Sequence, residues 1–184
     1  GKFIVVADDE DRENEGDLIL AAEFITPEKV NFLMQAKGMI CVALSPSKVT
    51  QLDLPLMGSE NRDALRTAYT VTIDAAPRFG VTTGISAADQ AVTIRRCADP
   101  LAVPADLRRP GHVFPLRARP GGVLQRVGQT EASVDLARLA GEYAPCDLVV
   151  ADLDPGMPDA RVNDIIRLAQ SFSMRYPLVD GHGN

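Results

Sequence analysis

Seven carboxylates surround a single arginine, Arg12, in residues 8–17 of the chain, here named the acidic segment. It follows an apolar run, residues 3–7, that predicts a strand, and it precedes a second apolar run, residues 18–22. Each added carboxylate raises the cost of keeping its neighbours ionised, and a divalent cation with oxygen ligands would relieve this repulsion. Ligand sites concentrate where strands end. The segment therefore predicts a metal or polar-substrate site, with a solvated acidic loop as the alternative.

Individual side chains of the acidic segment suit distinct roles. Arg12 could clamp a substrate oxygen, with Glu13 or Asp17 as a metal ligand or an acid–base group. The alternative is that Arg12 only neutralises the charges around it.

Two loops that open into helices are further candidates. Residues 80–86 are rich in glycine and threonine, and residues 126–131 contain Arg126. Backbone N–H groups at such helix starts bind phosphates and carboxylates, although plain helix capping is the more frequent explanation. Two such starts favour a phosphorylated substrate. His112 is either structural or catalytic, whereas His182 lies in an expected flexible tail, residues 180–184.

Composition limits the classes of function. A length of 184 residues predicts a single domain, residues 1–184. The net charge of -6 argues against nucleic acid as the main partner, because phosphate backbones need a basic face. No apolar run approaches the roughly 18 residues that span a membrane, and three scattered cysteines indicate a reducing compartment. We expect a cytoplasmic protein without membrane partners.

The elements that must position these residues alternate between strands and helices. Thr26 and Pro27 predict a helix start, with Gly38 as its stop, and Ser86 with Asp89 predicts another start. A further helix begins at 130 and runs to 140, and a last helix is expected over 158–172. Strands are predicted at 39–44, 69–73, 112–116 and 148–150, with Pro115 indicating an edge or irregular position. Residues 51–66 and 98–110 are expected to be irregular connections, so the chain predicts one mixed α/β domain.

The order of several long motifs resembles one enzyme family. Residues 8–18, 80–89, 111–116, 121–124 and 130–141 together resemble 3,4-dihydroxy-2-butanone 4-phosphate synthase, from the start of the chain to about residue 143. The resemblance implies an α/β (α+β) fold, a single mixed-sheet domain with flanking helices. It also implies conversion of ribulose 5-phosphate to a butanone phosphate plus formate on the riboflavin route. Mg²⁺ or Mn²⁺ would be the cofactor, and the protein would be a homodimer with active sites near the subunit interface.

The resemblance also implies roles for individual residues. The catalytic positions would be His112, Asp17 and Cys41. The metal would be held by Glu13 and by residue 129. The small phosphorylated sugar would be bound by Arg12, Glu13, Asp17, Thr83, Arg126, Gly128, Gln129 and Thr130.

Two positions depart from the family's pattern. The family's phosphate turn carries a metal-ligating histidine where this chain has Gln129, so metal binding is expected to be weakened. The family's acid–base glutamate falls on Ala151 when counted from Pro145, or on Val150 when counted back from Gly156. Asp152 could replace that glutamate only with a one-residue slip or bulge, and Asp147 is roughly 13 Å away along a strand.

Losing an acid–base group typically lowers a rate by about 10² to 10⁴. The leading hypothesis is thus a diverged lyase with weakened or changed activity on a phosphorylated ketose. The alternative is a non-catalytic paralogue that binds a sugar phosphate or acts as an interaction subunit.

Overall fold

The computed structural model describes residues 1–8, 11–13, 15–36, 38–140 and 148–152 of the chain. The last helix expected from the sequence, over 158–172, lies outside these residues.

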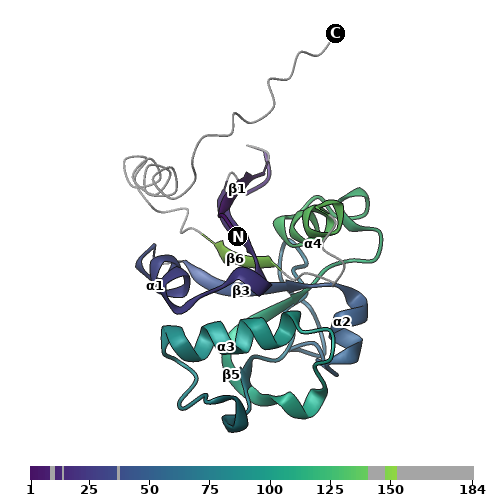
Figure 1. Ribbon diagram of the computed structural model, residues 1–184. Helices are drawn as coiled ribbons and strands as arrows, with labels where there is room; N and C mark the ends of the chain where they lie inside the picture. Colours follow the sequence, from purple (N-terminus) through teal and green to yellow (C-terminus); the bar gives the residue numbers. More distant parts are fainter. Residues whose placement is uncertain (9–10, 14, 37, 141–147, 153–184) are drawn as a thin grey trace.

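A six-stranded mixed sheet organises the fold (Figure 1). Its strand order is β1-β2-β6-β3-β5-β4, and among the strands that the structure describes only β3 and β5 pair in parallel. The strands are β1 Ile4–Ala7, β2 Gly16–Ala21, β3 Met39–Leu44, β4 Ile73–Ala75, β5 Leu107–Arg117 and β6 Leu148–Asp152. The mixed α/β domain predicted from the sequence is confirmed.

The α-helices begin where the sequence supplies caps. α1, Pro27–Gln35, follows Thr26, whose hydroxyl accepts from the Lys29 N–H, and α3, Ala87–Ala98, follows Ser86 in the same way. α2, Pro46–Gln51, was not anticipated, although Ser45 caps it and a proline stands at its first position. α4, Gln129–Leu139, begins after Gly128. Short 3-10 turns occur at Ala22–Phe24, Pro77–Phe79, Pro104–Asp106 and Gly122–Leu124.

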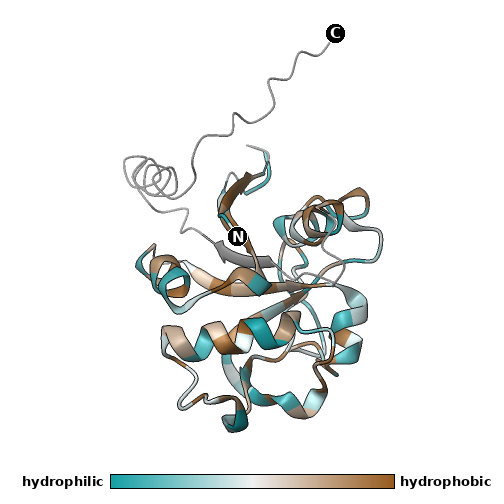
Figure 2. Cartoon of the chain, in the orientation of Figure 1, coloured by the Kyte–Doolittle hydropathy of each residue, from teal (hydrophilic) through white to brown (hydrophobic). Residues whose placement is uncertain are grey.

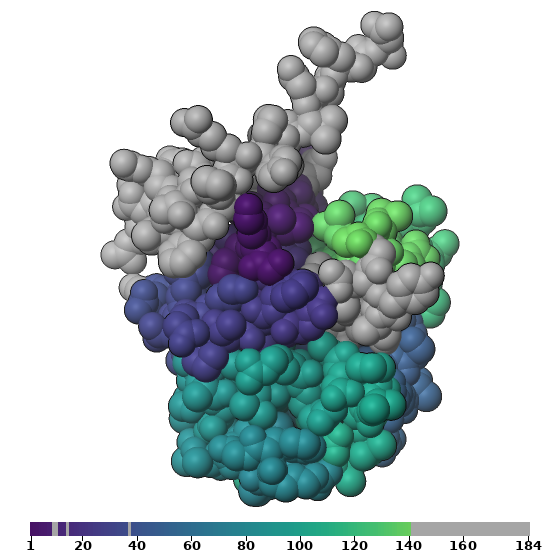
Figure 3. Space-filling view, in the orientation of Figure 1, coloured from purple at the N-terminus to yellow at the C-terminus, as the bar shows by residue number. Residues whose placement is uncertain are grey.

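The two faces of the sheet are covered differently. α1 and α3 pack on one face, over a core that includes Leu18, Val42 and Ile94. Their hydrophilic and hydrophobic residues alternate, as Figure 2 shows, because one side meets the core and the other meets water. In the space-filling view the first strand, the α1 region and the α3 region lie one above another, with α4 to one side (Figure 3). α4 packs against β2, β3 and β6 through residues such as Ala137.

Two local expectations were wrong, and one was right in its second alternative. Residues 69–73 form no continuous strand, because Tyr69 and Thr70 make only isolated bridges and β4 starts at Ile73. The connection expected over 98–110 ends early, since β5 begins at Leu107. Of the two alternatives for Pro115, the irregular position is confirmed, because β3 pairs with it on one side while β4 does not extend to it on the other. The carbonyl of Pro115 accepts a hydrogen bond from the Thr70 N–H. Because the segment around Thr70 is irregular, it tolerates the absence of a backbone N–H at Pro115.

Candidate active site

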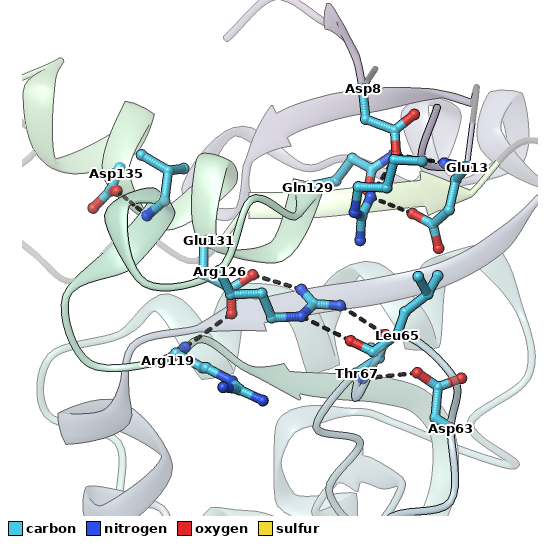
Figure 4. A network of polar contacts seen from close by, with 12 residues as sticks. Asp8, Glu13, Asp63, Leu65, Thr67, Arg119, Arg126, Gln129, Glu131 and Asp135 are labelled. Atoms are coloured by element: carbon cyan, nitrogen blue, oxygen red, sulfur yellow. Dashed lines mark hydrogen bonds and ion pairs between the residues drawn. The ribbon is translucent and has the colours of Figure 1, made fainter. Parts of the chain in front are cut away.

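Arg126 is fixed just before the N-terminus of α4. Its guanidinium donates to Glu131 Oε2 at 2.6 Å, to the Leu65 carbonyl at 3.1 Å and to Thr67 Oγ1 at 3.0 Å (Figure 4). Glu131 is buried, and Arg126 compensates its negative charge. The other carboxylate oxygen of Glu131 accepts a hydrogen bond from the Arg119 N–H at 2.9 Å. The result is a cation locked in one orientation beside a helix start.

The glycine before α4 is required by this arrangement. A Cβ atom added at Gly128 would lie 2.1 Å from Arg126 Nη1 and 2.9 Å from Glu131 Oε2. Any side chain would displace the ion pair, so glycine at 128 serves close approach rather than an unusual φ.

The second cation, Arg12, is held among oxygen atoms of the acidic segment and of α4. Its Nη1 contacts an Asp8 carboxylate oxygen, lies 2.5 Å from Glu13 Oε2 and donates to Gln129 Oε1 at 2.9 Å. Burial alone would raise the pKa of Asp8, but hydrogen bonds from the Glu15 N–H and from Arg12 outweigh it and lower that pKa. The acidic segment is thus ordered by its own ion pairs and tied to the start of α4.

A polar pocket opens between these two arginines on the sheet face that α4 partly covers. β2 contributes the buried Asp17 and β3 contributes the buried Cys41. The residues that line it are Arg12, Glu13, Glu15, Asp17, Cys41, Thr67, Tyr69, Leu116, Arg126, Gln129 and Thr130. Cations and carboxylates face one another here, an arrangement that suits a substrate carrying both an anionic group and hydroxyls.

Seven of the residues singled out from the sequence line this pocket: Arg12, Glu13, Asp17, Cys41, Arg126, Gln129 and Thr130. Gly128 lies directly behind it against Arg126. Glu15, Thr67, Tyr69 and Leu116 were not singled out. The polar character of residues 51–66 gave no sign that Thr67, just after them, would reach the α4 start.

His112 and Thr83 do not line the pocket; they lie in a second polar group. His112 is on β5, on the same face as Leu116 by strand alternation but about 13 Å further along. Its Nδ1 lies 2.9 Å from Oδ2 of the buried Asp74 on β4. Thr83 is exposed and precedes Gly84, which lies against the same carboxylate.

The donor atoms of the pocket fit a hard divalent cation. Glu13 and Gln129 oxygens already converge on one cationic nitrogen of Arg12, and Mg²⁺ takes oxygen ligands and usually keeps several waters. Within the described part of the chain, no three His, Cys, Asp or Glu side chains cluster tightly enough to form an all-protein metal cage. A site with one carboxylate, one amide oxygen and waters is therefore the kind that these residues could form.

The pairing of β6 bears on the missing glutamate. Val150 pairs with Cys41, which lines the pocket, and with Ile19. Ala151 instead pairs with Leu18 and Ile40, whose side chains are in the core on the opposite face. Of the two positions to which the family's glutamate could correspond, Val150 is thus the one that pairs with a pocket-lining residue.

Among the described residues, no helix is both long and apolar enough to cross a membrane.

Comparison with known proteins gives one consistent result. The family model for 3,4-dihydroxy-2-butanone 4-phosphate synthase matches residues 1–180. A riboflavin biosynthesis protein RibBA from Synechocystis is 53% identical over 95% of this chain. A 3,4-dihydroxy-2-butanone 4-phosphate synthase from Pasteurella multocida is 51% identical, and the match covers 97% of this chain and 82% of the relative. The chain spans only 32% of the Synechocystis relative and 43% of its Aquifex aeolicus counterpart.

Solved structures agree in fold. A crystal structure of 3,4-dihydroxy-2-butanone 4-phosphate synthase in complex with two magnesium ions matches with a TM-score of 0.82 and 45% identity. That match covers 91% of this chain and 84% of the other. RibBX, a two-domain synthase from A. baumannii, matches with a TM-score of 0.81 and 42% identity, over 91% of this chain and 50% of its own. The chain therefore belongs to the 3,4-dihydroxy-2-butanone 4-phosphate synthase family.

Proposed function

We propose that the chain is a lyase that converts ribulose 5-phosphate to 3,4-dihydroxy-2-butanone 4-phosphate and formate, as a step toward riboflavin. The observation that carries this proposal is the pocket itself. Five separated segments line it and bring two arginines, several carboxylates, a buried thiol and a helix start to one point. Relatives about 50% identical are named for this activity or for riboflavin biosynthesis.

Substrate binding divides between the two ends of the pocket. Arg126 and the N–H groups at the start of α4 bind the phosphate, because both present donors to an anion in a fixed orientation. Thr130 adds a hydroxyl at the same helix start. Arg12 and Asp17 bind the sugar oxygens at the other end, where the acidic segment meets β2.

Glu13 and Gln129 hold the divalent cation, Mg²⁺ or Mn²⁺. When bound, the ion polarises substrate oxygens and so favours enolisation. Gln129 offers a neutral amide oxygen that Arg12 already engages, so the ion is bound more weakly than it would be by the family's histidine. Arg12 holds the sugar and Asp17 stays buried beside it, which keeps the reacting carbons in one place.

The active site is completed in a homodimer. His112 is about 13 Å along β5 from the pocket-lining Leu116, too far to reach a sugar bound between Arg12 and Arg126 of its own chain. The part of this sheet face between Phe114 and His112 is only partly buried. A second copy placed there brings its own His112 and Thr83 to the pocket, where the histidine transfers a proton.

Turnover is slower than that of a family member with the full set of groups. Neither Val150 nor Ala151 can transfer a proton, and the loss of one such group lowers a rate by about 10² to 10⁴. The retained pocket keeps substrate affinity, because Arg12, Asp17, Arg126 and Thr130 all line it.

The test is incubation of the chain with ribulose 5-phosphate and Mg²⁺, followed by NMR of formate and of the four-carbon product. We expect both products in equal amounts at a low rate, and a higher rate for Gln129→His combined with Val150→Glu. The variant that combines Gln129→His with Ala151→Glu is the matched control, because it places the carboxylate at the other position to which the family's glutamate could correspond. Its rate of product formation should rise less. Ligand-dependent stabilisation without any product from the wild type or the double variants would refute the lyase and favour a binding subunit.

A further inference from the structure

Both oxygens of the Asp74 carboxylate contact one residue, His112. Asp74 is buried on β4, with 4% of its surface exposed, and His112 is on β5. Oδ1 accepts from the His112 backbone N–H at 3.0 Å, and Oδ2 lies 2.9 Å from the ring nitrogen Nδ1. The hydrogen bond from the His112 N–H to Oδ1 would by itself join β4 to β5. The contact of Oδ2 with Nδ1 therefore has a separate effect, which is on the imidazole ring of His112.

That effect is a fixed tautomer. An ionised carboxylate can only accept hydrogen bonds, so Nδ1 must carry the proton that it shares with Asp74. In the neutral ring the lone pair is then on Nε2. The side chain of His112 is 43% exposed while its Nδ1 edge is engaged, so the ring faces outward from the strand pair.

The surrounding backbone prevents Asp74 from turning away. Gly84 adopts φ +93°, and a Cβ atom there would lie 2.1 Å from Asp74 Oδ2. The Gly84 N–H is itself held by Asp89 Oδ2 at 3.0 Å, and Gly111 brings the backbone of β5 equally close to Ile73. The carboxylate is therefore clamped between a loop that only glycine permits and the strand that carries His112.

We propose that Asp74 is a positioning residue that keeps the proton of His112 on Nδ1 and leaves Nε2 to exchange protons with the substrate. This inference rests on the proton-transfer role proposed above for His112. Nε2 takes a proton from the substrate and the ring becomes an imidazolium, whose positive charge the adjacent carboxylate stabilises. Returning that proton restores the neutral ring, and the Nδ1 proton never leaves the pair.

The test is Asp74→Asn, which keeps the size of the side chain. The His112 N–H can only donate, so the asparagine oxygen must face it and the amide NH₂ must face Nδ1. Nδ1 then has to accept, and the proton moves to Nε2. Nitrogen-15 NMR of the neutral ring should show protonated Nδ1 in the wild type and protonated Nε2 in Asp74→Asn, with His182→Gln simplifying the assignment.

Kinetics complete the test. We expect Asp74→Asn to lower kcat by about 10² to 10⁴ with KM changed less than threefold, and Asp74→Glu to recover part of the loss. Asp106→Asn is the matched control, since it alters another buried carboxylate, one that accepts from the Val103 N–H outside this loop, and it should leave the tautomer unchanged.

Three results would overturn the proposal. The first is protonated Nε2 in the wild type, and the second is an unchanged tautomer in Asp74→Asn. The third is a flipped tautomer with a normal kcat. A normal kcat in His112→Gln would instead refute the role proposed for His112, and the inference would fall with it even if the tautomer result stood.

Discussion

The pocket around Arg12 and Arg126 and the pair formed by His112 and Asp74 are built in opposite ways. Arg12 is held by ion pairs within a loop, and its partners Glu13 and Gln129 are also the oxygens suited to a cation. Such contacts can be exchanged for contacts with a ligand. His112 and Asp74 are instead on paired strands and are clamped by glycine backbone. We infer that the pocket can exchange its internal contacts for contacts with a ligand, whereas the pair of His112 and Asp74 keeps one tautomer of the histidine ring.

The largest effect that separates the two regions is expected from His112→Gln. This change should lower kcat by about 10² to 10⁴ and change KM little, because the role proposed for His112 is proton transfer and the phosphate is proposed to bind at Arg126. Steady-state formate release measures both constants. His182→Gln, at the chain's other histidine, should leave both unchanged. A large rise in KM with normal kcat would mean that His112 binds rather than reacts.

Arg126→Lys should produce the complementary result. Lysine keeps the charge but loses the fork that engages Leu65, Thr67 and Glu131 together. We expect KM for ribulose 5-phosphate to rise about 10- to 100-fold, with a smaller change in kcat. The control is Arg138→Lys, because Arg138 is on the same helix with its side chain 77% exposed. Equal KM values for the two variants would contradict the phosphate site proposed at Arg126.

Asp89→Asn tests the rigidity assigned to the loop that clamps Asp74. Burial alone would raise the pKa of Asp89, but hydrogen bonds from Gly84 and Thr82 outweigh it and lower that pKa below its usual 3.8. The ionised form therefore stabilises the fold above pH 3.8, and this contribution is lost as the pH falls through the folded-state pKa. We expect the variant to lose about 1–3 kcal/mol of unfolding free energy at neutral pH.

Urea unfolding across pH measures this difference, which should shrink as the pH falls below 3.8. Glu60→Gln removes a carboxylate from an exposed ion pair and should change the free energy by less than about 1 kcal/mol. A difference between Asp89→Asn and wild type that stays constant down to the lowest pH would show that the charge of Asp89 does not stabilise the loop.

Local signals predicted much of this molecule, because they act within a few residues. Thr26 and Ser86 cap helices as their sequence contexts indicated. The strand predicted over 69–73 was wrong, since strand pairing depends on neighbours far along the chain. Motif resemblance brought together the arginines and carboxylates of the pocket, but it gave no sign of Thr67 or Asp74. Asp74 ends an apolar alternation in the sequence, and only the approach of β5 shows that its charge is buried against His112.

The central claim is that the pocket of one chain and the His112 of a second chain form a single active site. Co-expression of Arg12→Gln and His112→Gln chains with different tags gives a mixed dimer that contains one intact site. Random pairing should restore about a quarter of the wild-type rate of formate release, while each variant alone stays inactive. A mixed dimer no more active than its parents, in conditions where the wild type releases formate, would contradict the claim.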